Sequence, residues 1–519
     1  MKIEKIACGA ANVFLIRENN TSVLIDTQCH LVKHDLYFFR WFSYTESHYF
    51  FLFKTLKLLQ KTVDKIANIC CANLDYKHIS RRCPMAYNYL SNLKATLDNC
   101  IAELDKIHFM FCKNPETDFT RNRKLSFREY IQLMIQMQSK SVSNELLDFF
   151  DHSLSTPSKS AFTQQRYKLQ PEGWDFLFHS FVDQCHTLSD NLYNGYRLLA
   201  CDGSDVNVDR NPSDEHTFIN EGEKGYNAIH INALYDITNM TYCDFLVQGK
   251  KKLHEREALN TMIDRYSDST PVILMADRGY ESFNVFAHLN HKSMNFVIRM
   301  KDIHSNGILS AYDLPDCEFD TFIKTTLTRR HTKKTLGNPN TYTILQPATD
   351  FDFLDESGTE YDIEFRIVRI LLNNGTYICI ATNLSEKEFP LEEIKKLYRM
   401  RWSEETSFRE LKYTIGLVNW HSSIYEGFLQ EINARMILYN FCELVTSHAV
   451  VKTRDNTKHT YKINFATAVN ICRAYLKQGS DEKEIMLLIQ KHLTPVRPDR
   501  KYPINLRPKR NREFLYRAA

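Results

Sequence analysis

The order of apolar segments predicts an α/β protein built around one mixed β-sheet. Three segments with strand-like composition follow one another between residues 196 and 248, and helix-like and strand-like segments then alternate as far as residue 300. Consecutive strands followed by such an alternation predict a mixed sheet covered by helices. A long segment without proline or glycine near residue 400 predicts a further helix.

Length and composition describe an ordinary soluble protein. The chain has 519 residues, 43% of them hydrophobic and 25% charged, with a net charge of +3. A chain of this length is expected to form about two to four domains. Its fourteen cysteines include no CxxC pair, which favours reduced thiols over a disulfide framework or a zinc site. Because no signal peptide or membrane-spanning run is evident, we expect a cytoplasmic protein that does not bind a membrane.

The first residues predict a β-hairpin extension over residues 1–30. Two strand-like runs, Asn12–Ile16 and Val23–Asp26, flank an Asn-Asn turn. This stretch faintly resembles the start of a metallo-β-lactamase-fold protein, but the HxHxDH metal motif of that family is absent. We therefore interpret it as a possible fusion relic without hydrolase function, with an unrelated hairpin as the alternative. Residues 31–117 predict a helical segment of uncertain role.

Residues 118–192 predict a helical DNA-binding domain. Ser126 and Glu129 form a capping box that begins one helix, and Thr156 and Pro157 suit the N-cap and first position of a later one. Because this later helix follows a short turn and carries polar side chains, it fits the recognition helix of a helix-turn-helix. The residues expected to contact DNA are Gln164, Gln165 and Arg166. A plain helical bundle with a polar face is the alternative.

Residues 193–301 and 389–450 predict the two parts of a ribonuclease H-like domain. One apolar run ends at Asp202, and a later run ends in Asp277-Arg-Gly-Tyr. The intervening pattern predicts strands over 227–237, 242–248 and 295–300 and helices over 255–266 and 282–291. Because sites in α/β sheets form at the carboxyl ends of neighbouring strands, we expect the two aspartates to lie close together. Asp205 and Asp209 are alternatives to Asp202.

Between these two parts, residues 302–388 predict a β-rich insertion. Its runs Phe365–Leu372 and Tyr377–Ala381 are separated by Asn-Asn-Gly, which is a strong hairpin signal. Residues 451–519 predict a helical C-terminal region with a basic tail. Lys and Arg outnumber Asp and Glu in this tail and four prolines keep it extended, which suits contact with phosphates. A solvated terminus is the alternative.

The stretch Pro390–Leu417 predicts a helix with one distinctive face. At about 100° per residue, four side chains lie on one side of it, and Trp402 lies just beside them. Those four are Tyr398, Arg401, Glu405 and Lys412. An ordinary surface pair is the simpler interpretation of Arg401 and Glu405 taken alone.

The four residues together match the YREK signature of the DDE transposases of insertion-sequence family four. The chain resembles that family from roughly Asp118 to its C-terminus. The resemblance implies that Asp202, Asp277 and Glu405 are the catalytic and metal-binding acids. It also implies that Tyr398, Arg401 and Lys412 bind DNA. Arg278 is interpreted as a further phosphate contact or a partner of Asp277, and Trp402 as a core residue, with base stacking as the alternative.

Three carboxylates suit metal-dependent phosphodiester chemistry. Two divalent ions about 3.5–4 Å apart activate the nucleophile and stabilise the leaving oxygen, and Mg²⁺ prefers such hard oxygen ligands. We expect two Mg²⁺ ions, with Mn²⁺ as the alternative metal. The expected function is a cut-and-paste DNA transposase that catalyses phosphodiester hydrolysis and transesterification.

The resemblance also implies the partners of this reaction. They are double-stranded DNA, as terminal inverted repeats and target DNA, and a second copy of the chain in a synaptic dimer. A structure-selective nuclease on the same fold and a catalytically inactive DNA-binding repressor of transposition are the alternative functions.

Overall fold

The computed structural model describes residues 2–8, 11–18, 21–26, 88–188, 190–221, 224–354, 360–372, 375–449, 461–479 and 481–496. The chain forms two compact units, Met1–Tyr89 and Leu90–Ala519. In the first unit, β1 (Lys2–Cys8), β2 (Ala11–Glu18) and β3 (Thr21–Asp26) form an antiparallel sheet. The expected hairpin corresponds to β2 and β3, and β1 adds a strand. Most of the segment predicted from residue 31 and nearly all of the basic tail lie outside the described residues.

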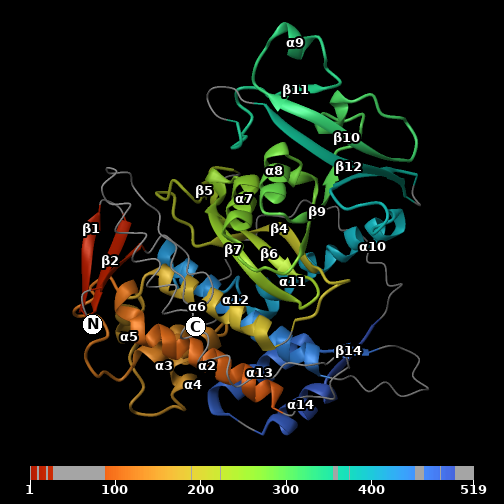
Figure 1. The fold of residues 1–519 in the computed structure, drawn as a ribbon. Coiled ribbons are helices and arrows are strands. Elements are labelled where there is room, and N and C mark those ends of the chain that lie inside the picture. Colours follow the sequence, from red (N-terminus) through yellow and green to blue (C-terminus); the bar gives the residue numbers. More distant parts are fainter. Residues whose placement is uncertain are drawn as a thin grey trace. The chain divides into compact units, whose positions relative to one another are not determined.

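A ten-stranded mixed sheet organises the second unit (Figure 1). Its order is β11-β10-β12-β13-β9-β8-β4-β6-β5, and β7 also pairs with β6. The strands are β4 (Arg197–Val208), β5 (Phe218–Ile219), β6 (Tyr226–Asp236), β7 (Thr241–Gly249), β8 (Val272–Ala276), β9 (Asn295–Met300), β10 (Phe319–Thr328), β11 (Tyr342–Ile344), β12 (Tyr361–Leu371) and β13 (Tyr377–Thr382).

The helices of this unit connect the strands or gather beside the sheet. They are α2 (Tyr89–Ile107), α3 (Phe127–Gln136), α4 (Val142–Phe149), α5 (Lys159–Arg166), α6 (Pro171–Leu188), α7 (Glu255–Arg265), α8 (Phe283–His291), α9 (Lys333–Leu336), α10 (Leu391–Met400), α11 (Trp402–Glu410), α12 (Tyr425–His448), α13 (Phe465–Gln478) and α14 (Glu482–Lys491). Short turns η3 (His108–Phe111), η4 (Lys250–Lys252), η5 (Arg278–Tyr280), η6 (Ile308–Ala311) and η7 (Leu411–Ile415) and the strand pair β14 (Tyr461–Ile463) and β15 (Leu493–Pro495) complete it.

The centre of the sheet has the strand order expected from the sequence. Strands β4, β6 and β7 pair antiparallel in sequence order, and β8 and β9 then add parallel to β4 through the crossover helices α7 and α8. The predicted mixed α/β fold is therefore confirmed, and the strands predicted over 227–237, 242–248 and 295–300 are found within one or two residues. Helices α2 to α6 precede the sheet, as expected.

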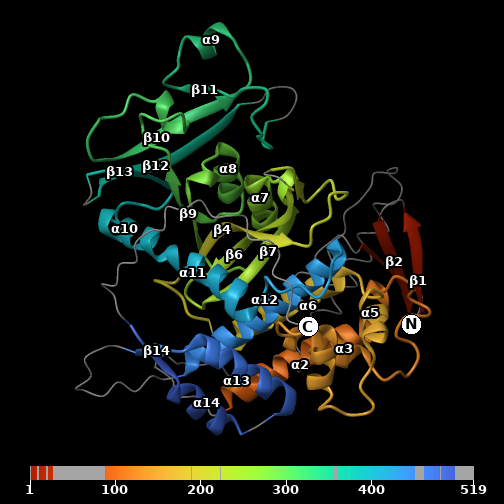
Figure 2. The same ribbon diagram turned by 180° about the vertical axis from the view of Figure 1, so that it is seen from behind.

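Different helices cover the two faces of the sheet (Figure 2). Helices α7 and α8 pack on one face, where they share a core with Leu199. Helix α10 packs on the other face, where Ile394 and Leu397 meet Leu198. Because side chains alternate along a strand, the residues of β4 that follow are divided in the same way. Asp202 shares the face of Leu198, whereas Gly203 and the residues at alternate positions after it share the face of Leu199.

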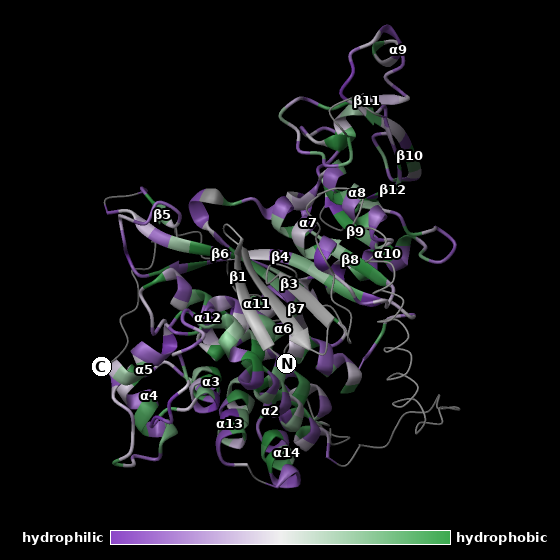
Figure 3. Cartoon of the chain, turned by 60° about the vertical axis from the view of Figure 1, so that its left-hand side comes forward, coloured by the Kyte–Doolittle hydropathy of each residue, from purple (hydrophilic) through white to green (hydrophobic). Residues whose placement is uncertain are grey.

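The predicted hairpin of the insertion is confirmed, and it joins the central sheet. β12 and β13 pair antiparallel, and β13 pairs in turn with β9 through Ala381 and Ile298. Gly375 adopts a φ of +79° in the connection, a conformation that favours glycine; the two asparagines before it lie outside the described residues. In Figure 3, β8 and β9 are largely hydrophobic, whereas the loops around α9 are largely hydrophilic.

Local capping confirms one predicted helix start and corrects another. Ser126 accepts the backbone N–H of Glu129, and the Glu129 carboxylate accepts the N–H of Ser126, which is the predicted capping box of α3. Helix α5, however, is capped by Ser158, which accepts the N–H of Ala161. The predicted start at Thr156 and Pro157 was wrong because the next available hydroxyl caps the helix instead.

Two further features concern the described part of the chain as a whole. The nine cysteines that the described segments contain after residue 88 are free thiols, and all but Cys317 are buried. No helix among the described residues is both long and apolar enough to cross a membrane.

A buried ion-pair network fixes the preceding helices to α12. Arg166 of α5 lies 3.0 Å from a carboxylate oxygen of Glu431, and both side chains are almost fully buried. His421 lies between Glu431 and Glu145 of α4, at 3.2 and 3.6 Å. Arg435 donates to the carbonyls of residues 137 and 138 at the end of α3. Three helices are therefore held to α12 by charges that have no access to water.

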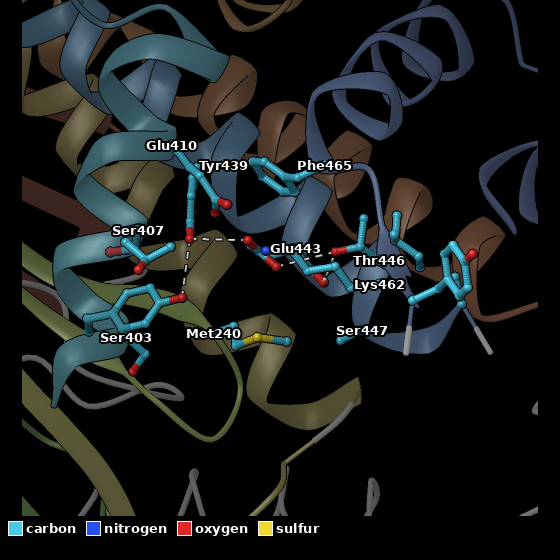
Figure 4. A pocket seen from close by; sticks show the side chains of 15 residues that line it. Met240, Ser403, Ser407, Glu410, Tyr439, Glu443, Thr446, Ser447, Lys462 and Phe465 are labelled. Carbon is cyan, nitrogen blue, oxygen red and sulfur yellow. Dashed lines mark hydrogen bonds between the residues drawn. The ribbon is translucent and has the colours of Figure 1, made fainter. Parts of the chain in front are cut away.

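A cavity of about 430 Å³ lies on the other side of α12, between it, α11 and β14. Glu410, Glu443 and Tyr439 gather at its centre (Figure 4). Tyr439 and Thr446 donate hydrogen bonds to Glu443 at 3.2 and 3.3 Å. Burial and the neighbouring Glu410 carboxylate raise the pKa of Glu443 to about 8. Glu443 therefore holds its proton to a higher pH than an isolated carboxyl group does.

The buried Glu431 carboxylate makes the free energy of unfolding depend on pH in the acidic range. Burial raises its pKa, but Arg166, His421 and Arg435 lower it from its usual 4.5 to about 2. The free energy of unfolding is therefore expected to fall as the pH falls from 4.5 towards 2, because the unfolded chain takes up the proton first. Urea unfolding across this range measures the slope.

The variant E431Q should lose that slope and should also be destabilised at neutral pH by about 3–5 kcal/mol, because Arg166 is left buried without its partner charge. E426Q is the matched control, since Glu426 lies on the same helix in an exposed pair with Lys113. Equal slopes for the two variants would contradict the assignment.

The raised pKa of Glu443 predicts the opposite dependence of the free energy of unfolding on pH. Because its folded pKa lies above its usual value, the folded state holds a proton that the unfolded state has lost. The free energy of unfolding should therefore fall as the pH rises from 4.5 towards 8. E443Q, which imitates the neutral acid, should remove this loss and be more stable than the wild type at alkaline pH. Urea midpoints on either side of this range test it; a wild-type advantage at alkaline pH would refute it.

Candidate active site

Asp202 and Asp277 occupy neighbouring positions on two parallel strands. The pairing of β4 with β8 ends at Cys201 and Ala276, so that Asp202 is the next residue of β4 and Asp277 directly follows β8. Parallel strands lie about 4.7–4.9 Å apart. The expectation that Asp202 ends its strand was wrong, because β4 continues to Val208 through its pairing with β6.

Hydrogen bonds to the backbone hold both aspartates. Oδ1 of Asp202 accepts the N–H of Gly203 at 2.8 Å. Oδ1 of Asp277 accepts the N–H of Gly279 at 2.8 Å and so caps the short turn η5. Each carboxylate therefore keeps its second oxygen for another partner.

The predicted helix over 390–417 is present but consists of three segments. Pro390 is the N-cap of α10 and not its first residue. Arg401 joins α10 to α11 with helical backbone angles, and a π-helical turn, η7, follows as far as Ile415. Gly416 then ends the helix with a φ of +94°. Helical geometry thus continues from residue 391 to residue 415, which places Arg401 and Glu405 one turn apart.

Arg401 connects the helix to the sheet. Its Nη1 lies 3.7 Å from Oδ2 of Asp202, and its Nη2 lies 3.1 Å from Oε1 of Glu405. The rings of Tyr398 and Trp402 each lie 5.7 Å from the guanidinium carbon. Arg401 is 5% exposed. One buried guanidinium therefore lies between two of the three expected acids, held in place by two aromatic rings.

The carboxylates interact with one another. Burial raises the pKa of Asp202, and the negative charges of Asp277 and Glu405 raise it further, against the lowering effects of the Gly203 N–H and Arg401. The structure thus brings the three expected acids into one electrostatic cluster. Oxygen donors whose charges repel one another are the chemistry that a divalent cation stabilises. The residues present therefore fit a divalent-metal site.

The ligand atoms of Asp202, Asp277 and Glu405 do not all lie within 4.8 Å of one another. Within the described residues, the group whose ligand atoms all lie within 4.8 Å of one another is His186, Asp236 and Cys243. That group surrounds Arg197, whose buried guanidinium lies 2.7 Å from Asp236, so it forms a structural ion pair and is unsuited to a cation.

Lys412 and Tyr398 have partners within the protein. Nζ of Lys412 donates to the Ser204 hydroxyl and to the Asp205 carbonyl oxygen, at 2.6 Å each. Lys412 therefore ties the π-helical turn to β4 just beyond Asp202. Tyr398 is buried in the core beneath α10, and its ring contacts Arg401. In this arrangement Tyr398 orients Arg401.

Glu404 is a site residue that sequence reasoning missed. It is fully buried, whereas the side chain of Glu405 is 42% exposed. Burial and the charge of Asp202 raise the pKa of Glu404 well above its usual range. Helical spacing places the two glutamates about 100° apart, but it does not show that Glu404 faces β4. Glu405 is thus the accessible carboxylate.

The structure also places the two accessory residues of the site. Trp402 is 59% exposed, so its interpretation as a core residue was wrong; it is the first residue of α11 and lies on the side of the helix opposite the buried Ser407 and Phe408. Arg278 is exposed beside Asp277. Both side chains remain available to a ligand.

Two of the three residues expected to contact DNA are buried. Gln165 is 6% exposed and Arg166 is 1% exposed. Arg166 donates to the carbonyl of Gly427 and to Gln430 in addition to its ion pair with Glu431. The prediction that these two side chains contact DNA was therefore wrong, because both are buried and Arg166 is bound by α12. Gln164 is exposed.

Comparison with known proteins identifies the domain that contains these acids. The family model described as the transposase DDE domain matches residues 193–441. The chain thus contains a transposase DDE domain and is a phosphoryl-transfer enzyme of DNA transposition, a class that uses divalent metal ions. No curated protein sequence matches the chain.

Seven chains of known structure match. One is the cryo-EM structure of a piggyBac transposase synaptic complex with hairpin DNA, with a TM-score of 0.41 and 10% sequence identity, covering 80% of this chain and 84% of that one.

Proposed function

We propose that this protein is a DNA transposase that excises an insertion sequence and joins it to target DNA. The observation that carries the proposal is the single cluster formed by Asp202, Asp277 and Glu405, which come from two neighbouring strands and one helix. The YREK spacing supports membership of insertion-sequence family four. The order β7-β6-β4-β8-β9, with three antiparallel strands followed by parallel additions, supports a ribonuclease H-like sheet.

The three carboxylates would hold two Mg²⁺ ions, or Mn²⁺, which would supply an activated nucleophile and stabilise the leaving oxygen. The protein's own residues set the geometry. Arg401 fixes the separation of Asp202 and Glu405, and Lys412 fixes the helix to β4. Arg278 offers a cation to a DNA phosphate beside Asp277.

Trp402 offers an exposed ring beside the acids. Any DNA base can stack on such a ring, because every base has an aromatic face, so the contact does not depend on the DNA sequence. We infer double-stranded DNA as the substrate, in the form of terminal inverted repeats and target DNA. We also infer a dimer in the synaptic complex, since two ends must be held together for joining, and a cytoplasmic location.

Strand transfer is the decisive test of this function. Purified protein, Mg²⁺, target DNA and pre-cut ends are incubated together, with the end sequence taken from the inverted repeats that flank the gene. Joined products are expected. Nicked DNA without joining would indicate a structure-selective nuclease, and binding without either reaction would indicate an inactive repressor.

The two adjacent glutamates give a matched pair of variants. E405Q should abolish strand cleavage and leave end binding intact, because it removes the accessible carboxylate while preserving the shape of the side chain. E404Q should retain cleavage, because a buried amide of the same size replaces a buried acid that does not face solvent. A nicking assay together with a gel-shift assay separates the two steps. The reverse pattern would make Glu404 the third acid.

A further inference from the structure

We propose that His230 is a positioning residue that sets the spacing of Asp202 and Asp277 from the opposite face of the sheet. The inference deepens the proposed function and rests on it. It stands on the contacts that a buried imidazole makes with two carboxylates and with the backbone next to Asp202, and on the contact of one of these carboxylates, Glu255, with the backbone next to Asp277.

His230 bridges a strand and a helix. It is a buried residue of β6, directly opposite Asp205 of β4 in the sheet register. Its Nδ1 lies 2.6 Å from Oδ1 of Asp205. Its Nε2 lies 3.1 Å from Oε1 of Glu255, the first residue of α7, in a contact with the geometry of an ion pair. Both ring nitrogens thus face a carboxylate.

The imidazole lies against the residue that follows Asp202. A Cβ atom added to Gly203 would lie 2.1 Å from Nε2 of His230 and 3.3 Å from Glu255. No side chain other than hydrogen leaves room for the imidazole there. The position of His230 therefore fixes the backbone of β4 immediately next to the first aspartate.

The same cluster reaches the loop of the second aspartate. A Cβ atom on Gly279 would lie 3.0 Å from Asp277 and 3.7 Å from Oε2 of Glu255. Arg256, the next residue of α7, donates to the Gly279 carbonyl at 2.8 Å. Glu255 thus lies between the backbone beside Asp202 and the backbone beside Asp277, and His230 holds it there.

The cluster also contacts the helix of the third acid. The carbonyl oxygen of Asp205 accepts a hydrogen bond from Lys412, so a shift of Asp205 moves the turn that follows Glu405. Lys250 pairs with the Asp205 carboxylate at 2.8 Å. One network therefore contacts the backbone beside Asp202, the backbone beside Asp277 and the helix that carries Glu405. It consists of His230, Asp205, Glu255 and Lys250.

The bridge requires the imidazolium form. Only the doubly protonated ring carries the positive charge that pairs with both carboxylates. Burial lowers the pKa of His230, but Asp205 and Glu255 together raise it above its usual value. When the ring loses its proton, Asp205 and Glu255 both lose their shared counter-charge, and β4 and α7 are no longer held at one separation. His230 thus pairs with both Asp205 and Glu255 at a pH below its pKa in the folded protein, and this pairing is lost at a pH above that pKa.

The variant H230Q tests the proposal, with H288Q as its matched control. His288 is also a buried histidine between two carboxylates, Asp264 at 2.8 Å and Asp352 at 2.9 Å, but it lies on α8 away from the acids. Outer-shell substitutions of this kind cost about 10–100-fold in metal affinity or activity. H230Q is expected to weaken Mn²⁺ binding and slow strand cleavage by that factor, whereas H288Q should leave both unchanged.

The pH profile separates positioning from support of the fold. The ratio of wild-type to H230Q cleavage should fall as the pH rises through the His230 pKa. D205N, at a side chain that is 46% exposed, should move this fall to lower pH because the imidazolium loses one counter-charge. Equal effects of H230Q and H288Q, or a ratio independent of pH, would overturn the proposal.

The metal titration also distinguishes the two proposals. If the wild type binds Mn²⁺ but cleaves no DNA, the proposed function fails, and calorimetric Mn²⁺ titration of the three variants still decides the role of His230. If the wild type cleaves and H230Q binds Mn²⁺ as tightly as the wild type, the positioning role alone fails.

Discussion

The repulsion among three carboxylates is the constraint that the rest of the structure has to overcome. Asp202 and Asp277 lie side by side, and Glu405 approaches from α11. Neighbouring negative charges repel one another and destabilise the folded state unless other groups hold the three side chains in place. The sheet ladder holds the two aspartates, the apolar contacts of α10 hold the helix, and the Arg401 guanidinium provides the opposite charge between them. An assembled acid site thus depends on packing that is remote from it.

Helix α12 connects this site to the preceding helices. Asn440 exchanges hydrogen bonds with the backbone of Tyr242 on β7, and Glu431 and Gln430 of the same helix bind Arg166 on α5. Because these bonds are buried, breaking any of them leaves a charge or a polar group without water. Helices α3 to α5 therefore form one body with the catalytic sheet, and any DNA that they contact is placed directly relative to the acids.

The sequence predicted local features well and long-range partners poorly. The capping box at Ser126, the hairpin before Tyr377 and the strand at Asn295 depend on neighbouring residues, and all three are found. The common face of Arg401 and Glu405 followed from helical spacing. Arg166 was misread because a charged side chain normally seeks solvent, and its partner Glu431 lies far along the chain. Glu404 was overlooked because the strand that covers it is equally remote.

The continuous sheet also has a mechanical consequence. The outer strands of the insertion are joined to the strand of Asp277 by an unbroken series of backbone hydrogen bonds, from β10 through β12, β13 and β9 to β8. A flexible linker would absorb a force applied at the far end, whereas a ladder transmits it. Tension on the outermost strands is therefore transmitted along the sheet to the backbone beside Asp277.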